Sequence, residues 1–271
     1  MLTFLKGKLL SALHAIFYRN RLDSSGNVFY PKGLSRITSR FNQNLIEKGY
    51  SPPWIWSVEA CRNYWSTEVN QSTNPNETQQ YANKSTELIE FLHKFWKSYV
   101  NCELSLLELG CNSGSNLETL RLLGYKRLAG LEINSTAVEL MSRVFPDLYK
   151  DVTLKIGSLE DTLPLLPMDS CDVVFTMAVL MHVHPNSNGI FSEIIRVARK
   201  YVVTVEPEFA NCGYVFSRNY RRLFQRLGCT QLSSMKIGID ATAADIADYH
   251  GVILRILSVP NSGSEGSYSS A

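Results

Sequence analysis

The sequence predicts an α/β fold with a doubly wound, mostly parallel sheet of seven strands and a helical extension at the N-terminus. Between residues 104 and 258, short apolar runs alternate with stretches of helical length, which is typical of βαβ units. Hydrophobic residues make up 45% of the 271 residues and charged residues 19%, so the chain can build a large core. A fibrous, collagen-like or disordered protein is excluded.

The first half of this pattern predicts three strands and two helices. The apolar run Leu104–Leu109 reads as a buried strand, and a Gly/Ser/Asn turn leads from it into the helix Ser115–Leu123. Strand Arg127–Ile133 and helix Ser135–Val144 follow, and strand Val152–Ile156 ends at a short acidic connection. Ligands of such sheets bind beyond the carboxyl ends of the strands, so the residues just after each strand are site candidates.

The second half supplies the remaining elements. The apolar run Asp172–Thr176 is the fourth strand, helix Asn188–Ala198 precedes the strand Tyr201–Val205, and a helix is expected over Tyr214–Leu227. The two last strands are expected at Gln231–Lys236 and Val252–Leu257. These two strands complete the count of seven.

The turn after the first strand reads Glu108-Leu109-Gly110-Cys111-Asn112-Ser113-Gly114-Ser115-Asn116. Gly110 and Gly114 allow conformations that a Cβ atom would oppose, and Asn112 is of a type that tolerates a left-handed backbone. A dinucleotide-binding turn needs G-x-G-x-x-G, which fails here at the second and third glycines. The carboxylate of Glu108 suits a ligand with a cationic head and would repel a pyrophosphate, so a nicotinamide dehydrogenase is disfavoured.

This turn resembles motif I of the class I S-adenosylmethionine-dependent methyltransferases, E-x-G-x-G-x-G, with Asn112 in place of a glycine. The resemblance covers about residues 80–258 and implies the Rossmann-like fold of that class with S-adenosyl-L-methionine as cofactor. It implies that Glu108 and Gly110 hold the methionine end. Cys111, Asn112, Gly114 and Asn116 are further expected cofactor contacts. The segments LELGCNxGxNL and GLEIN also resemble methylases associated with pseudaminic acid and other surface glycans.

A second landmark ends the next strand, where Glu132 lies 22 positions after Gly110. A carboxylate there offers two acceptor oxygens and can bind both hydroxyls of a ribose. By the family resemblance, Glu132 holds the ribose with Ile133 beside it. Ser158 and Leu159, after the third strand, are expected near the adenine. Thr176, at the end of the fourth strand, completes the expected cofactor contacts.

The segment after the fourth strand holds the candidates for the methyl acceptor. Methyl transfer is an in-line displacement, and a base is needed only where the nucleophile loses a proton near the transition state. His182 matches a histidine that many small-molecule methyltransferases carry here, and both an active-site and a structural role fit it. His184, held extended before Pro185, is the second catalytic candidate. Glu206 is the third, with an ordinary acid at a strand end as the alternative.

Residues 1–75 are interpreted as a basic, aromatic helical extension or lid, residues 76–260 as the methyltransferase domain and residues 261–271 as a flexible tail. Residues 1–50 hold eight Lys and Arg against two Asp and Glu, a net charge of +6. Such an arm suits an anionic partner, or none. The aromatic residues Trp54, Trp56, Tyr64 and Trp65 are candidates for the lid, with a place in the core as the alternative.

Residues 2–18 carry an apolar stripe that either packs on the body or lies on a membrane surface. No apolar run approaches the roughly 18 residues of a membrane-spanning helix. We therefore expect a cytoplasmic protein, and a peripheral membrane contact through residues 2–18 stays open as the alternative to packing on the body. The six cysteines form no CxxC pair, which predicts no metal site and favours a reducing compartment.

The function that the sequence favours is methyl transfer to an oxygen or nitrogen of a small polar or glycan-like acceptor. An RNA or protein acceptor, captured by the basic arm, is one alternative. No module for sequence-specific nucleic-acid recognition is recognisable in the chain. A catalytically silent protein that kept the cofactor-binding fold is the other alternative. The identity of the acceptor and the oligomeric state are not determined by these patterns.

Overall fold

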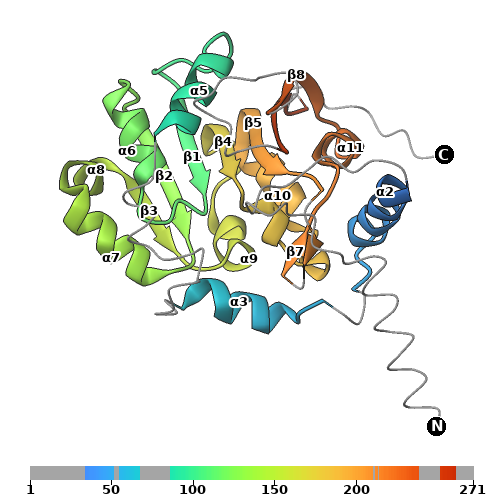
Figure 1. The fold of residues 1–271 in the computed structure, drawn as a ribbon. Helices are drawn as coiled ribbons and strands as arrows, with labels where there is room; N and C mark the ends of the chain where they lie inside the picture. The colour runs from blue at the N-terminus through green and yellow to red at the C-terminus, as the bar shows by residue number, and fades with distance from the viewer. Residues whose placement is uncertain are drawn as a thin grey trace, which may run out of the picture.

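The computed structural model describes residues 34–51, 55–67, 86–209, 211–212, 214–237 and 251–260, with a seven-stranded sheet at its centre (Figure 1). The strands are β1 (Ser105–Leu109), β2 (Arg127–Glu132), β3 (Thr153–Ile156), β4 (Cys171–Met177), β5 (Ala198–Pro207), β8 (Thr230–Lys236) and β9 (Val252–Ser258). They lie in the order β3-β2-β1-β4-β5-β9-β8, and β9 runs opposite to the other six strands of this sheet. The predicted fold class is confirmed. The strand order reverses between β1 and β4, where such sheets bind their ligands.

Helices cover both faces of the sheet. They are α5 (Glu87–Trp96), α6 (Ser115–Leu122), α7 (Ser135–Val144), α8 (Pro146–Asp151), α9 (Leu159–Thr162), α10 (Ile190–Val197) and α11 (Tyr220–Arg226). Successive strand residues point to opposite faces, so Leu106 joins a core with α5 and α6 while Leu107 joins another with α10 and α11. These two cores hold the carboxyl ends of β1 and β4 in place.

The helix expected over Tyr214–Leu227 is shorter than predicted. Its first residues belong instead to a small hairpin of β6 (Asn211–Cys212) and β7 (Val215–Phe216). The helix α11 begins only at Tyr220, because the side chain of Asn219 accepts a hydrogen bond from the backbone N–H of Arg222 and caps it. The apolar residues before Asn219 pack as part of the hairpin and not as a helical turn.

Two further helices precede the sheet: α2 (Leu34–Glu47) lies beside α11, and α3 (Val58–Ser66) runs along the edge of the molecule beneath α9 and beside β7 (Figure 1). Ile46 of α2, Cys61 of α3 and Phe216 of β7 form a small core of their own. The predicted membrane-surface segment 2–18 and the predicted tail 261–271 lie outside the described residues. None of the helices in the described ranges is both long and apolar enough to cross a membrane.

Candidate active site

A cavity lies at the carboxyl ends of the strands, between the loops after β1, β2, β3 and β4 on one side and helix α3 on the other. It encloses about 1000 Å³ of space between protein atoms, part of which is open to solvent. Ten of the predicted cofactor and catalytic residues line this cavity or a smaller hollow beside it, as described below. The cavity lies where the strand order reverses, which is where sheets of this kind bind their ligands.

The glycine turn after β1 forms the floor of the cavity. Gly110, Asn112 and Gly114 all have positive φ angles, of 69°, 47° and 82°. A Cβ atom on Gly110 would lie 2.6 Å from Cγ2 of Val179, so the turn needs a glycine there for space as well as for conformation. Asn112 adopts the left-handed conformation that its residue type tolerates. The backbone therefore approaches the cavity closely.

Glu132 ends β2 at the wall of this cavity, and its carboxylate is buried. One of its oxygens accepts the backbone N–H of Asn112 at 2.7 Å and the other accepts that of Asn134 at 2.9 Å. The backbone N–H of Ile133 also interacts with this carboxylate, so at least one of its about four acceptor positions remains for a ligand hydroxyl. Burial raises the pKa of Glu132, and the backbone N–H donors act against that rise. The group is thus held in place by backbone donors while it keeps acceptor capacity for a ligand hydroxyl.

Glu108 does not line the cavity but is buried beneath the turn. Its carboxylate accepts a hydrogen bond of 2.7 Å from the side-chain amide of Asn116. Because a carboxylate without a proton only accepts, the nitrogen of Asn116 must face Glu108. Asn116 itself lines the smaller hollow, together with Gly110 and Met177. Glu108 therefore orients the Asn116 amide, whose oxygen accepts no hydrogen bond from the residues that the structure describes.

Cys111 and Gly114 support the turn from within. The Cys111 side chain occupies the space where a Cβ atom on Gly130 would stand, 2.6 Å from its sulfur. Burial, followed by the charges of Glu132 and Glu108, raises the pKa of the Cys111 thiol well above its usual value, so it is no nucleophile at neutral pH. Gly114 packs directly against Met141 of α7.

The far wall is formed by the ends of β2 and β3 and by a helix of the extension. Ile133, Ser158 and Leu159 line the cavity as expected for residues at those strand ends. Arg62 of α3 also lines it, and its guanidinium lies 3.7 Å from Glu160 and 3.8 Å from Asp161. Sequence reasoning missed Arg62, because nothing in the sequence gives the position of α3 relative to α9 (Leu159–Thr162).

His182 lies in a short turn after β4 and lines the cavity. Its Nδ1 is 3.0 Å from the backbone oxygen of Tyr214, and since a carbonyl only accepts, Nδ1 carries the proton. Burial lowers the pKa of His182 to about 4, so the ring is neutral at pH 7 and Nε2 keeps its lone pair. Within the described residues, Nε2 has no hydrogen-bond partner. The ring of Trp65 lies 4.0 Å away, centroid to centroid.

His184 also lines the cavity, but both of its ring nitrogens are engaged. Nδ1 accepts the backbone N–H of Asn186 at 3.1 Å, which places the proton on Nε2. Nε2 then donates to the backbone oxygen of Trp56 at 3.1 Å. His184 thus links the loop after β4 to the segment that leads into α3, and it has no nitrogen available for a reacting group.

Thr176 and Glu206 lie side by side beneath the cavity and do not line it. The Thr176 hydroxyl donates to the Glu206 carboxylate at 2.9 Å, and the same oxygen accepts the N–H groups of Val179 and Leu180 at 3.0 and 3.1 Å. Burial raises the pKa of Glu206 to about 7, against these donors, which lower it. This geometry does not fit the expected cofactor contact of Thr176 or a direct catalytic contact of Glu206. Both residues instead hold the turn that carries His182.

A family model described as a methyltransferase domain matches residues 107–203, which run from β1 into β5. No curated protein matches the chain.

Several solved structures have a similar fold. One is an S-adenosylmethionine-dependent methyltransferase from Mesorhizobium loti, with 13% identity, a TM-score of 0.51 and coverage of 65% of this chain and 99% of that one. Geranyl diphosphate C-methyltransferase from Streptomyces coelicolor A3(2) also has 13% identity and a TM-score of 0.51, covering 77% and 97%. Magnesium protoporphyrin IX methyltransferase from Synechocystis PCC 6803 has 13% identity and a TM-score of 0.50, covering 82% and 97%.

Proposed function

Because this chain is an S-adenosylmethionine-dependent methyltransferase, we propose that it methylates an oxygen or nitrogen of a small-molecule acceptor bound between the glycine turn and His182. The observation that carries the proposal is the pair of polar groups that line one cavity. The cavity presents a carboxylate with remaining acceptor capacity at one end and an unprotonated imidazole nitrogen, His182 Nε2, at the other. A cofactor and an acceptor can therefore meet within it.

The residues of the cavity suit the parts of S-adenosylmethionine. Glu132 would bind the ribose hydroxyls, and the Asn116 amide oxygen would accept from the ammonium group of the methionine end. Ile133, Ser158 and Leu159 would contact the adenine. When bound, the cofactor supplies a methyl group on a positively charged sulfur, which keeps the bonding electron pair as the methyl group leaves. The buried Glu108 and the cavity-lining Glu132 both favour that positive charge.

His182 would position the acceptor and take its proton at Nε2. A base with a pKa of about 4 is weak, yet it suffices here. An oxygen that gains a methyl group becomes a strong acid, and any neutral imidazole beside it accepts that proton readily. The hydrogen bond from Nδ1 to the Tyr214 carbonyl keeps the ring in the required tautomer.

The matched family and the similar structures give no support to the glycan-associated subtype that the motif segments suggest. In the extension, α2 packs on the body through Ile46 and Glu47. Its described part therefore gives no specific support to capture of RNA or protein by a free basic arm.

The test is calorimetry with S-adenosylhomocysteine on the wild type and on Glu132→Ala, with Glu139→Gln, an exposed acid on α7, as the control. Loss of two hydrogen bonds to a charged group should weaken binding at least about tenfold in Glu132→Ala and leave Glu139→Gln unchanged. Equal affinity in all three proteins, or no binding by the wild type, would contradict the proposed site.

A further inference from the structure

The part of the cavity around His182, called the acceptor end below, is lined mostly by apolar side chains among the described residues. Among the described residues that line the cavity, Arg62, Glu132 and Glu160 are the charged ones, and both histidines are neutral at pH 7 because burial lowers their pKa values. Glu132 belongs to the ribose end, and Arg62 is balanced by Glu160. The wall around His182 is instead apolar and is formed by Val58, Cys61, Val179, Val183 and Ile190.

Two ring nitrogens lie at this apolar wall, in addition to the guanidinium of Arg62, whose buried Nε also has no hydrogen-bond partner in the described part of the chain. One is Nε2 of His182, an acceptor. The other is the indole N–H of Trp65, which is buried and has no hydrogen-bond partner in the described part of the chain. The two rings are 4.0 Å apart between centroids, so the donor and the acceptor belong to one small area. A buried N–H without a partner costs about 1–3 kcal/mol, which a ligand oxygen would relieve.

From this pairing, and resting on the proposed function, we propose that the acceptor is an uncharged, ring-bearing compound with a hydroxyl group, and that Trp65 selects it. The ring packs on the apolar wall and on Trp65. The hydroxyl donates its proton to His182 Nε2 while its oxygen accepts from the Trp65 N–H. In the reaction the O–H bond and the methyl–sulfur bond break, an O–CH₃ bond forms, and the proton passes to Nε2.

Oxygen fits this arrangement better than nitrogen does. A hydroxyl oxygen has two lone pairs, so one can accept the Trp65 N–H while the other attacks the methyl group. A neutral amine has a single lone pair, which cannot do both. The preference for a hydroxyl group therefore depends on the indole N–H and not on the indole ring.

A sugar fits this wall poorly. Each additional hydroxyl placed against the apolar side chains would lose its hydrogen bonds to water, at about 1–3 kcal/mol each. An anionic acceptor would also be desolvated near two carboxylates, because Glu160 and Asp161 lie 3.7 and 3.8 Å from the guanidinium of Arg62, the cation among the described residues that line the cavity. The acceptor end thus discriminates against glycans and acids.

The probes are four compounds: 2-naphthol, 2-naphthylamine, 6-hydroxy-2-naphthoate and methyl α-D-glucopyranoside. Their binding is measured by calorimetry in the presence of S-adenosylhomocysteine, and their turnover by release of that product from S-adenosylmethionine. The naphthol should bind and react best. Trp65→Phe, which keeps a ring and removes the N–H, should lower kcat/KM for the naphthol about tenfold and leave the naphthylamine within about twofold. Trp65→Leu should weaken binding of both ring compounds.

Trp56→Phe makes the same change in an indole that does not line the cavity, and it should keep the wild-type ratio of naphthol to naphthylamine turnover. Better binding of the glucoside or the naphthoate, or no binding of any probe by a protein that binds S-adenosylhomocysteine, would overturn the inference and leave the proposed function intact. An equal loss for naphthol and naphthylamine in Trp65→Phe would overturn the role of the indole N–H. Failure to bind S-adenosylhomocysteine would instead overturn the proposed function.

Discussion

Glu206 shows how one buried carboxylate can shape the site without touching it. Ala178, directly after β4, has a positive φ of 56°, a strained conformation for a residue with a side chain. The next residues, Val179 and Leu180, donate their N–H groups to Glu206, and Thr176 donates its hydroxyl. These bonds stabilise the strained turn and direct His182 toward the cavity.

Thr176→Val tests this assignment at the residue scale. The change removes one hydrogen bond to Glu206 and keeps the shape of the side chain, so we expect a loss of about 1 kcal/mol in the free energy of unfolding. The affinity for S-adenosylhomocysteine should stay the same, because Thr176 does not line the cavity. The kcat should fall, since the His182 turn is loosened. Weaker cofactor binding in calorimetry would restore Thr176 as a cofactor contact.

The low pKa of His182 predicts a pH dependence of stability. The folded pKa of about 4 lies below the ordinary value of 6.5, so between these two values the unfolded chain binds the extra proton. The contribution of His182 to the free energy of unfolding is therefore fully present above pH 6.5 and is lost as the pH falls toward 4. Between pH 7 and pH 5 the wild type should lose about 2 kcal/mol more than His182→Gln in urea titrations. Equal losses would show that His182 titrates normally.

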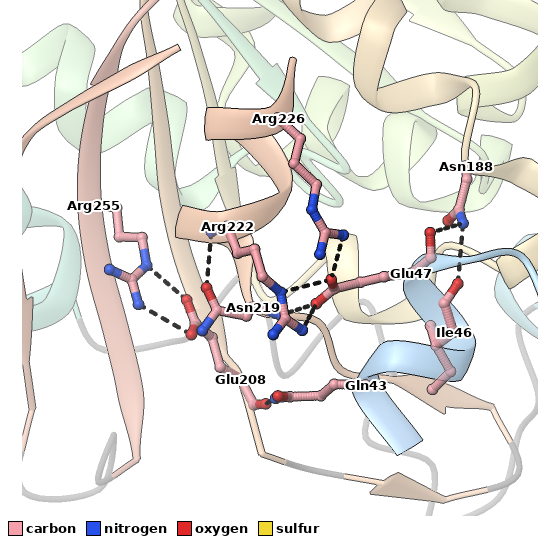
Figure 2. Close-up of polar contacts among 9 residues, drawn as sticks. All are labelled: Gln43, Ile46, Glu47, Asn188, Glu208, Asn219, Arg222, Arg226 and Arg255. Atoms are coloured by element: carbon pink, nitrogen blue, oxygen red, sulfur yellow. Dashed lines mark hydrogen bonds and ion pairs between the residues drawn. The ribbon is translucent and has the colours of Figure 1, made fainter. Parts of the chain in front are cut away.

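At the scale of elements, a buried acid of α2, Glu47, has a central place among the contacts that attach the extension (Figure 2). The Glu47 side chain is only 1% exposed and accepts hydrogen bonds from Arg222, Arg226 and the backbone N–H of Asn219. The Asn188 amide donates to the last carbonyls of α2 at Ile46 and Glu47. Together with the bond from His184 to Trp56, these contacts hold α3 over the cavity.

Glu47→Gln should loosen this attachment. A glutamine amide accepts only at its oxygen, so it cannot keep all four hydrogen bonds that the carboxylate accepts, and we expect a loss of about 2 kcal/mol in the free energy of unfolding and faster hydrogen exchange in α2 and α3. The KM for the acceptor should rise while the affinity for S-adenosylhomocysteine stays constant. Glu59→Gln, an exposed acid on α3, is the matched control. Unchanged exchange in α3 would show that it docks independently of α2.

At the scale of the whole molecule, the predicted boundary near residue 75 does not separate the extension from the active site. Four residues of α3 line the same cavity as the loops after β1 to β4: Val58, Cys61, Arg62 and Trp65. Gln43 of α2 donates to the backbone of Glu208, whose carboxylate pairs with Arg255 of β9 (Figure 2). The described part of the extension and the sheet therefore form one working unit.

A chain that begins at Leu34 tests how much of the extension the site needs. Every described residue of the cavity lies at or after Val58, and the α2 contacts are kept. We expect S-adenosylhomocysteine affinity and acceptor KM within about twofold of the full chain. A chain that begins at residue 68 lacks α3, and with it one wall of the cavity, so it should no longer bind the acceptor.

The same shortened chain also tests the alternative of a basic capture arm. Binding of the full chain and of the chain from Leu34 to a single-stranded RNA is compared at low and high salt. Without a capture role, the two proteins should bind equally weakly. Salt-dependent binding by the full chain that the shorter chain lacks, with small-molecule turnover intact in both, would favour an RNA acceptor.

Much of the fold and half of the site could be predicted from the sequence. Apolar runs and the glycine turn are local patterns, and they predicted the seven strands, the bend at Gly110 and the acid at Glu132. The family resemblance implies a cofactor contact for Glu108, and Thr176 is expected as another, yet both side chains lie beneath the cavity. Which way a strand-end side chain points depends on the twist and neighbours of the strand, and no local pattern contains that information.

By itself the sequence determined the fold class and the cofactor, because both depend on residues that are close along the chain. Only the tertiary structure decided which residues face the acceptor. Trp65 meets His182, and Glu47 meets Arg222, across more than 100 positions, and such contacts are determined by how packed helices dock on the sheet. The chemistry of the acceptor end therefore follows from packing, and the chemistry of the cofactor end follows from a short motif.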